Sequence, residues 1–144
     1  MIDQAKLEHV TKRRIWGARW MAGLLLTTAL HDIGVLRGYG NDAFNFASEA
    51  VWIIVMSLFI LFAGGGLVRT AAMRAALYDE STIEHARRSL AFGFWAALLA
   101  CGVSWALSSY VPIGGPVVAR AVMTYSVAMA LAHFATLEAK ALKE

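Results

Sequence analysis

The sequence is poor in cysteine and in charged residues, and each scarcity excludes a class of structure. Its single cysteine, Cys101, lies within an apolar run. It cannot form an internal disulfide and has no metal-ligand spacing, so we expect it to behave as a small apolar residue. Charged residues make up 16% of the chain, against about 25% in typical soluble domains. This shortage argues against an ordinary soluble fold.

Motifs of the common enzyme classes are also missing from the sequence. It contains no Walker loop, no G-x-G-x-x-G, no H-E-x-x-H, no C-x-x-C and no G-x-S-x-G. The polar segments are too short to form a catalytic domain. We therefore expect a protein that is not an enzyme.

What the chain has instead is apolar sequence, 59% of its 144 residues. The apolar residues are concentrated in runs that reach the roughly 20 residues needed to cross a bilayer. The expected fold is an all-α, antiparallel four-helix transmembrane bundle in which residues 1–144 form a single membrane domain. The expected spans are residues 15–36, 49–68, 89–110 and 117–137.

The polar segment 69–88 sets the expected orientation. It would form a cytoplasmic hairpin between the second and third spans. With the polar head, the first turn of the first span and the tail, it carries eleven of the thirteen lysines and arginines, and only Arg37 and Arg120 lie on the other side. The positive-inside rule then places both termini in the cytoplasm, in a multi-pass protein of the bacterial inner membrane. Because the first run has full membrane length, we interpret it as an anchor and not as a cleaved signal peptide.

The net charge of +3 indicates lipid contacts. The basic residues flank apolar spans, which favours anionic headgroups of the bilayer as partners over nucleic acid. Residues 1–14 are expected to lie at the headgroups, followed by the interfacial residues Trp16 and Trp20. Arg19, one turn inside the span, can pair with Glu138 if the first and fourth helices touch, and such a pair would be structural.

Four ionisable residues are expected near the outer ends of the spans. Such groups are costly at membrane depth and tend to be paired or functional. The sharper hypothesis is an Asp32–Arg120 pair completed by Glu49 or His31. The alternative is that all four reach the headgroup region. The candidate intramembrane polar cluster consists of His31, Asp32, Glu49 and Arg120.

The four histidines do not predict a haem or a metal site. In the expected bundle His31 and His133 differ by about 16 Å along the bilayer normal, so one iron cannot use both. We expect His133 to be hydrogen-bonded within the bundle, and His9 and His85 to be solvated. No cofactor and no metal are expected.

Small residues and helix-start residues have structural interpretations. Small-residue stripes allow close helix packing in membranes. Ser81 followed three residues later by Glu84 matches a capping box, which places a turn near 79–82. The expected packing residues are Gly64, Gly65, Gly66, Gly93, Ala97 and Cys101, and the expected cytoplasmic capping and basic residues are Ser81, Glu84, Arg87 and Arg88.

The segment from the hairpin into the third span resembles small four-span bacterial inner-membrane proteins of unknown function. The pattern is a D-E-x-T, a basic helix start and an F-x-F/Y-W span, carried by Asp79, Glu80, Thr82, Arg87, Arg88, Phe92, Phe94 and Trp95. The resemblance implies a similar membrane fold and transfers no activity. The favoured function is a non-enzymatic accessory or regulatory subunit that binds a membrane-protein partner or a second copy of itself. The alternatives are a small dimeric transporter or channel and a quinone- or haem-linked redox subunit.

Overall fold

The computed structural model describes residues 4–32, 42–63, 80–110 and 114–143, and the regular structure among them is entirely α-helical. The sequence therefore predicts the all-α class correctly. The helices are α1 (Gln4–Asp32), α2 (Asp42–Ala63), α4 (Glu80–Ser108) and α5 (Gly115–Ala141). The expected notch at 64–66 and the hairpin residues 69–79 lie outside the described residues.

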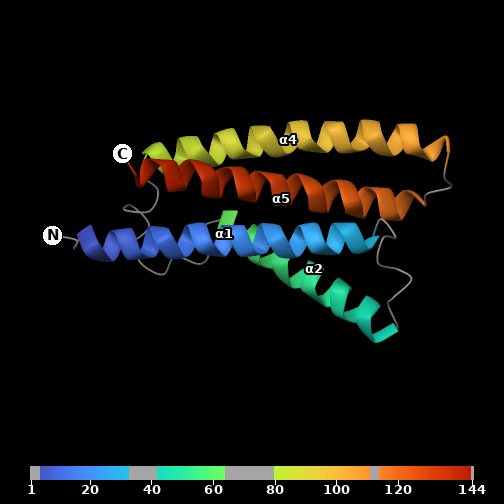
Figure 1. Ribbon diagram of the computed structural model, residues 1–144, viewed down its shortest axis with the longest axis horizontal. Helices are drawn as coiled ribbons and strands as arrows, with labels where there is room; N and C mark the ends of the chain where they lie inside the picture. Colours follow the sequence, from blue (N-terminus) through green and yellow to red (C-terminus); the bar gives the residue numbers. More distant parts are fainter. Residues whose placement is uncertain (1–3, 33–41, 64–79, 111–113, 144) are drawn as a thin grey trace.

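Consecutive helices run in opposite directions along the long axis of the molecule, as Figure 1 shows. The start of α1, the start of α4 and the end of α5 lie at one end of the molecule. We call this the terminal end. The opposite end holds the end of α1 and the starts of α2 and α5. Residues 4–14, expected as a separate polar head, are continuous with α1.

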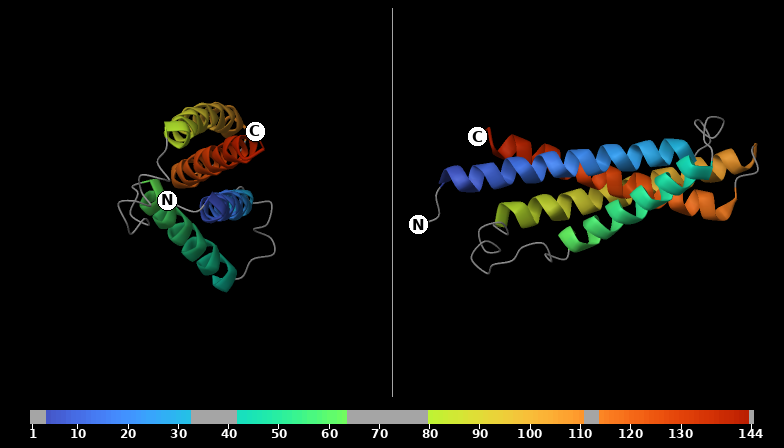
Figure 2. Two further views of the ribbon diagram at one scale, coloured as in Figure 1. Left: turned by 90° about the vertical axis from the view of Figure 1, so that its left-hand side faces the viewer. Right: turned by 90° about the horizontal axis from the view of Figure 1, so that it is seen from below.

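Helix α5 is the centre of the structure. It packs along α1 on one side and along α4 on the other, whereas α2 contacts α1 less extensively and crosses it obliquely (Figure 2). The described helices therefore form an open row of α4, α5 and α1, with α2 set against α1. The sequence predicts the alternating direction of the helices but not this order in space.

Alanines let α1 and α5 approach closely. The buried side chains of α1 recur every three or four residues, which places them on one face of the helix. They meet a face of α5 that is also rich in alanine, and one residue of α2 joins them. This core consists of Ile15, Ala18, Ala22, Leu25, Val55, Ala128, Leu131, Phe134 and Ala135.

Two small residues carry the contact of α4 with α5. Ser89 and Gly93, one turn apart, are the buried residues of α4. A Cβ atom on Gly93 would lie 2.9 Å from both the Cβ of Ala130 and the carbonyl oxygen of Ser126. Only glycine permits this approach of the two helices without a shift of backbone. Farther along the expected stripe, Ala97 is half-buried and Cys101 is exposed.

The rest of α4 presents large apolar side chains outward. Trp95 is 68% exposed, Leu99 64% and Trp105 79%. Within the described residues, α4 and α5 are long and apolar enough to cross a membrane. The other two expected spans extend into residues 33–36 and 64–68, which the structure does not describe.

The helix boundaries differ slightly from the expected ones. Helix α4 begins at Glu80, so Ser81 lies inside its first turn. The capping box of Ser81 and Glu84 stays a prediction, because the residues that precede α4 lie outside the described part of the chain. Helix α5 begins at Gly115 and carries Pro116 in its first turn, where the missing N–H of proline leaves no helical hydrogen bond unmade.

Candidate functional site: a buried polar cluster between three helices

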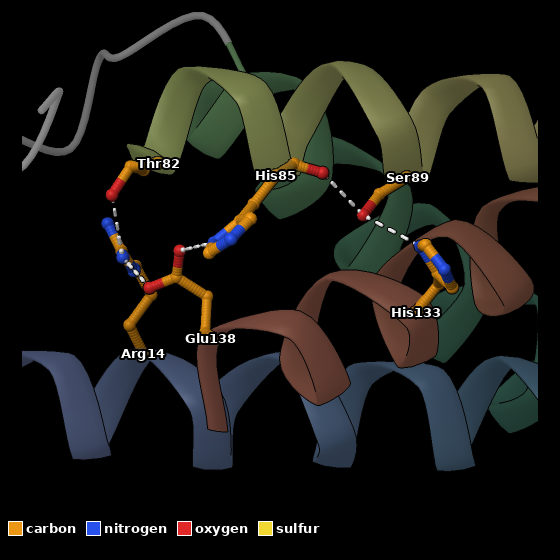
Figure 3. Close-up of polar contacts among 6 residues, drawn as sticks. All are labelled: Arg14, Thr82, His85, Ser89, His133 and Glu138. Atoms are coloured by element: carbon orange, nitrogen blue, oxygen red, sulfur yellow. Dashed lines mark hydrogen bonds and ion pairs between the residues drawn. The ribbon is translucent and has the colours of Figure 1, made fainter. Parts of the chain in front are cut away.

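The candidate site is built around a buried carboxylate at the terminal end. Glu138, near the end of α5, is 4% exposed. It lies between Arg14 of α1 and His85 of α4, as Figure 3 shows. Burial of an ionised carboxylate is costly unless it is paired and hydrogen-bonded. We call the six residues drawn in this figure the three-helix cluster: Arg14, Thr82, His85, Ser89, His133 and Glu138.

Each oxygen of the Glu138 carboxylate has its own partner. Nη2 of Arg14 forms an ion pair and hydrogen bond with Oε2. Nδ1 of His85 lies 3.0 Å from Oε1. One side chain of α5 thus holds both of its neighbouring helices at the same level.

Arg14 also reaches α4 directly. Its Nη2 donates to the hydroxyl of Thr82 at 3.4 Å. Its guanidinium carbon lies 5.4 Å from the ring centroid of Phe134, a cation–π geometry. The guanidinium therefore contacts both other helices of the cluster.

The acceptor character of the carboxylate determines the tautomer of His85. An ionised carboxylate only accepts hydrogen bonds, so Nδ1 of His85 carries the proton and donates it to Glu138.

Ser89 extends the cluster along the interface of α4 and α5. Its Oγ donates to the carbonyl oxygen of His85 at 2.7 Å and lies 3.3 Å from Nδ1 of His133. Because a hydroxyl has one hydrogen, Nδ1 of His133 is the donor in the second contact. The ring of His133 also stacks on Phe92, with centroids 4.6 Å apart and planes at 14°. The prediction that His133 is hydrogen-bonded within the bundle is confirmed.

These hydrogen-bond directions argue against nucleophilic chemistry at the Ser89–His133 pair. A serine nucleophile must donate its proton to a basic histidine nitrogen. Here Ser89 donates to a backbone carbonyl, accepts from His133 and is 3% exposed. In this arrangement its hydroxyl is used for packing the helices together. Within the described residues, no group of three or more His, Cys, Asp or Glu is placed to hold a metal ion.

A second polar contact set lies toward the opposite end. Nη1 of Arg120 lies 3.8 Å from Oε1 of Glu49, an ion pair between α5 and α2. The guanidinium also lies over the ring of Trp52 at 5.5 Å. Nε1 of Trp52 donates to Oγ1 of the fully buried Thr124 at 2.7 Å.

The structure brings together two of the four residues expected in the outer cluster. Glu49 and Arg120 are paired. His31 and Asp32 lie in the last turn of α1, and their side chains lie outside the described part of the chain. The carboxylate expected as the first partner of Arg120 was Asp32, and the partner found in the structure is Glu49.

Two expectations at the terminal end are wrong. His85 is not solvated, because its side chain is 18% exposed and bonded to Glu138. The basic partner of Glu138 is Arg14 and not Arg19, which is exposed. Arg19 is five residues from Arg14, about 140° around the helix axis, so the two side chains leave α1 on different sides.

One sequence pattern could have indicated this cluster. Thr82, His85 and Ser89 follow one another at three- and four-residue spacings, which places them on one face of a helix. Gly93 continues the same face. This stripe, which starts with polar residues and ends in glycine, is the side of α4 that packs on α5.

Near the start of α4, Glu84 and Arg88 form an exposed ion pair one turn apart, with 2.8 Å between Nε of Arg88 and Oε1 of Glu84. Arg87 is exposed beside them. Such surface pairs contribute little to stability. These residues therefore present charge at the terminal end without joining the buried cluster.

Comparison with known proteins does not add a family. No protein-family model, no curated protein and no solved structure matches the chain. The class of protein is accordingly defined by the structure itself: the described residues form an all-helical protein, and two of their helices are long and apolar enough to span a membrane.

Proposed function

We propose that this chain is a four-span protein of the bacterial inner membrane, with both termini in the cytoplasm, that serves as a non-enzymatic accessory or regulatory subunit of a larger membrane complex. The observation that carries the proposal is the outward face of α4. Helix α4 is long enough to cross a bilayer, buries only Ser89 and Gly93 against α5, and exposes Trp95, Leu99 and Trp105.

A soluble protein would have to cover such a surface. Large contiguous apolar patches on soluble proteins mark interaction sites or membrane contacts. A lipid-facing helix needs no such cover, because acyl chains are as apolar as leucine. The exposed face of α4 therefore supports a position in the bilayer, where a partner helix or lipid can lie against it.

The charge distribution supports the proposed orientation. Exposed basic residues gather at the terminal end, where the starts of α1 and α4 meet the end of α5. They are Lys12, Arg13, Arg87, Arg88, Lys140 and Lys143. By the positive-inside rule this end faces the cytoplasm.

The use of the buried polar groups supports a non-enzymatic role. In the three-helix cluster, Arg14 and His85 each bond one oxygen of the Glu138 carboxylate, and Ser89 with His133 joins α4 to α5. These contacts fix the relative positions of the helices. A rigid bundle with an uncovered apolar helix is the form expected of a subunit that docks laterally.

The topology can be tested with single cysteines. In a Cys101→Ser background, Lys143→Cys and Ser109→Cys place one thiol at each end of the molecule. In intact cells, a membrane-impermeant maleimide is expected to label Ser109→Cys and to reach Lys143→Cys only after the inner membrane is opened. Labelling of both thiols in intact cells, or release of the protein from membranes by alkaline carbonate, would refute the membrane topology.

The subunit role can be tested by mild detergent purification of a tagged copy, followed by mass spectrometry of the eluate. We expect a larger membrane protein in stoichiometric amount, reduced by Trp95→Ala combined with Leu99→Ala. The matched control is Ile53→Ala with Ile54→Ala, which removes exposed apolar side chains from α2. A charge reversal of Arg87 and Arg88 tests whether the cytoplasmic end contributes to the contact. Purification as a lone oligomer would contradict the accessory role.

A further inference from the structure

We propose that the outward face of α1 binds the phosphodiester headgroup of an anionic phospholipid. The face contains Arg13, Trp16, Arg19 and Trp20, all exposed. Arg13 and Arg19 supply the positive charge, and the two tryptophans favour a position of the helix at the membrane–water interface. The inference rests on the proposed position of the protein in a membrane and names a partner for its cytoplasmic end.

Helical geometry brings these four side chains together. Successive residues of an α-helix turn by about 100°. Arg13 and Arg19 therefore lie about 60° on either side of Trp16, and Trp20 follows Trp16 one turn later. The ring centroids of Trp16 and Trp20 are 5.4 Å apart. The two arginines flank a paired aromatic surface.

Along the outward side of α1, the exposed residues change from polar to apolar, as they would on passing from water into a bilayer. Glu8 and His9 are exposed before the four residues of the proposed site, which we call the patch, and Leu24 and Leu30 are exposed after it. Trp16 and Trp20 are separated by a rise of about 6 Å, which matches a headgroup layer of roughly 5–7 Å on each side of the hydrocarbon core. The patch therefore falls at the depth where tryptophan and phosphate both lie.

The charges of the patch are available to a lipid. Lys12, on the same face, is paired with Glu8 at 2.6 Å. Arg13 and Arg19 form no ion pair within the described part of the chain. Arginine presents a planar fork of donors that matches a phosphate and can bind it through two hydrogen bonds. A flexible lysine makes only a point contact, so the two arginines are the headgroup ligands.

Helix α1 packs on α5 through its opposite face, so the patch takes no part in the contact between the two helices. Ile15, Ala18 and Ala22 are buried against α5. Arg14, which lies between Arg13 and Ile15, is directed inward to Glu138. Neighbouring arginines of the basic run 12–14 thus have different roles: Arg14 pairs with Glu138 inside the bundle, and Arg13 is exposed on the outward face.

The test is titration of the purified full chain in detergent with phosphatidylglycerol or phosphatidylcholine, with bound lipids counted by native mass spectrometry. The variant is Arg13→Gln with Arg19→Gln. The matched control, Arg87→Gln with Arg88→Gln, removes the same charge from α4 at the same end. We expect phosphatidylglycerol to bind about tenfold more weakly to the α1 variant. The control should retain its affinity, and binding of phosphatidylcholine should be equal in all three proteins.

Three outcomes would overturn the proposal. They are unchanged phosphatidylglycerol binding in the α1 variant, an equal loss in the α4 control, and equal affinity of the wild-type chain for both lipids. Thermal unfolding in the same detergent checks that the variants remain folded, which is expected because the altered side chains are exposed. Carbonate extraction of native membranes separates the two proposals. A protein that stays in the membrane without a preference for anionic lipid refutes the headgroup site alone.

Discussion

Arg14 of α1 and Glu138 of α5 form a buried ion pair across 124 positions of sequence. The side chains are 11% and 5% exposed. Such a pair costs desolvation free energy when it forms, and the loss of one partner leaves a buried charge without compensation. His85 on the second carboxylate oxygen extends the dependence to α4.

We expect Glu138→Gln to destabilise the protein by about 3–5 kcal/mol, because the amide keeps the shape of the carboxylate but leaves the charge of Arg14 uncompensated. Denaturant unfolding in detergent, followed by circular dichroism, measures the change. Glu84→Gln is the control, since it breaks an exposed pair with Arg88 and should have little effect. Equal changes in the two variants would show that the buried pair has no special role.

Gly93→Ala and Gly102→Ala are expected to change stability in opposite directions. At Gly93 the new methyl group would meet Ala130 and a backbone oxygen at 2.9 Å, whereas at Gly102 nothing lies within 4 Å. Forced repacking costs about 1–3 kcal/mol. At the open position, alanine favours a helix by about 1 kcal/mol over glycine. Melting temperatures of both variants test the expectation, and a tolerated Gly93→Ala would show that α4 and α5 can separate freely.

The bond between Trp52 and Thr124 should stabilise the attachment of α2 to α5. Thr124→Val preserves the shape of the fully buried threonine but leaves the indole N–H without its acceptor, which costs about 1–3 kcal/mol. A double-mutant cycle with Trp52→Phe isolates the interaction. Thr136→Val, which removes an exposed hydroxyl bonded to its own helix, is the control. Simple additivity of the two changes would mean that the bond contributes nothing.

Acid should weaken the exposed start of α1 by protonating Glu8. A hydrogen bond from Lys12, aided by its charge, lowers the pKa of Glu8 below its ordinary value of 4.5. The resulting stabilisation is present above pH 4.5 and is lost as pH falls through the lowered pKa. Carbon NMR titration of the carboxyl group is expected to show this pKa rise toward 4.5 in Lys12→Gln and also at high salt. An unchanged pKa in that variant would exclude Lys12 as the cause.

The sequence was sufficient to predict the helices because long apolar runs determine them locally. It also predicted the exposure of His9 and the internal hydrogen bond of His133. It did not predict the partner of Glu138, because the choice between Arg14 and Arg19 depends on which face of α1 meets α5. Faces are selected by the packing of alanines on both helices, which is a property of the pair.

The same limit explains the error at His85. In isolation it lies in a charged segment and would be solvated. Only contact with α5 turns the face of Thr82, His85 and Ser89 inward. Conversely, Glu49 and Arg120, which the sequence grouped, form an ion pair, because the level of a residue follows from its position along its helix and does not require knowledge of neighbours.

The central position of α5 has a consequence for biosynthesis. Of the four described helices, α5 is the last to leave the ribosome, yet α1 and α4 pack mainly on it. In the proposed membrane topology, the alanine, serine and glycine faces of the earlier helices therefore remain unpacked until α5 is made, and the ion pair across 124 positions can form only then. The packing of the earlier helices then depends on the synthesis of α5. A nascent chain arrested before residue 115 should remain accessible to membrane chaperones and proteases, although its earlier helices are complete.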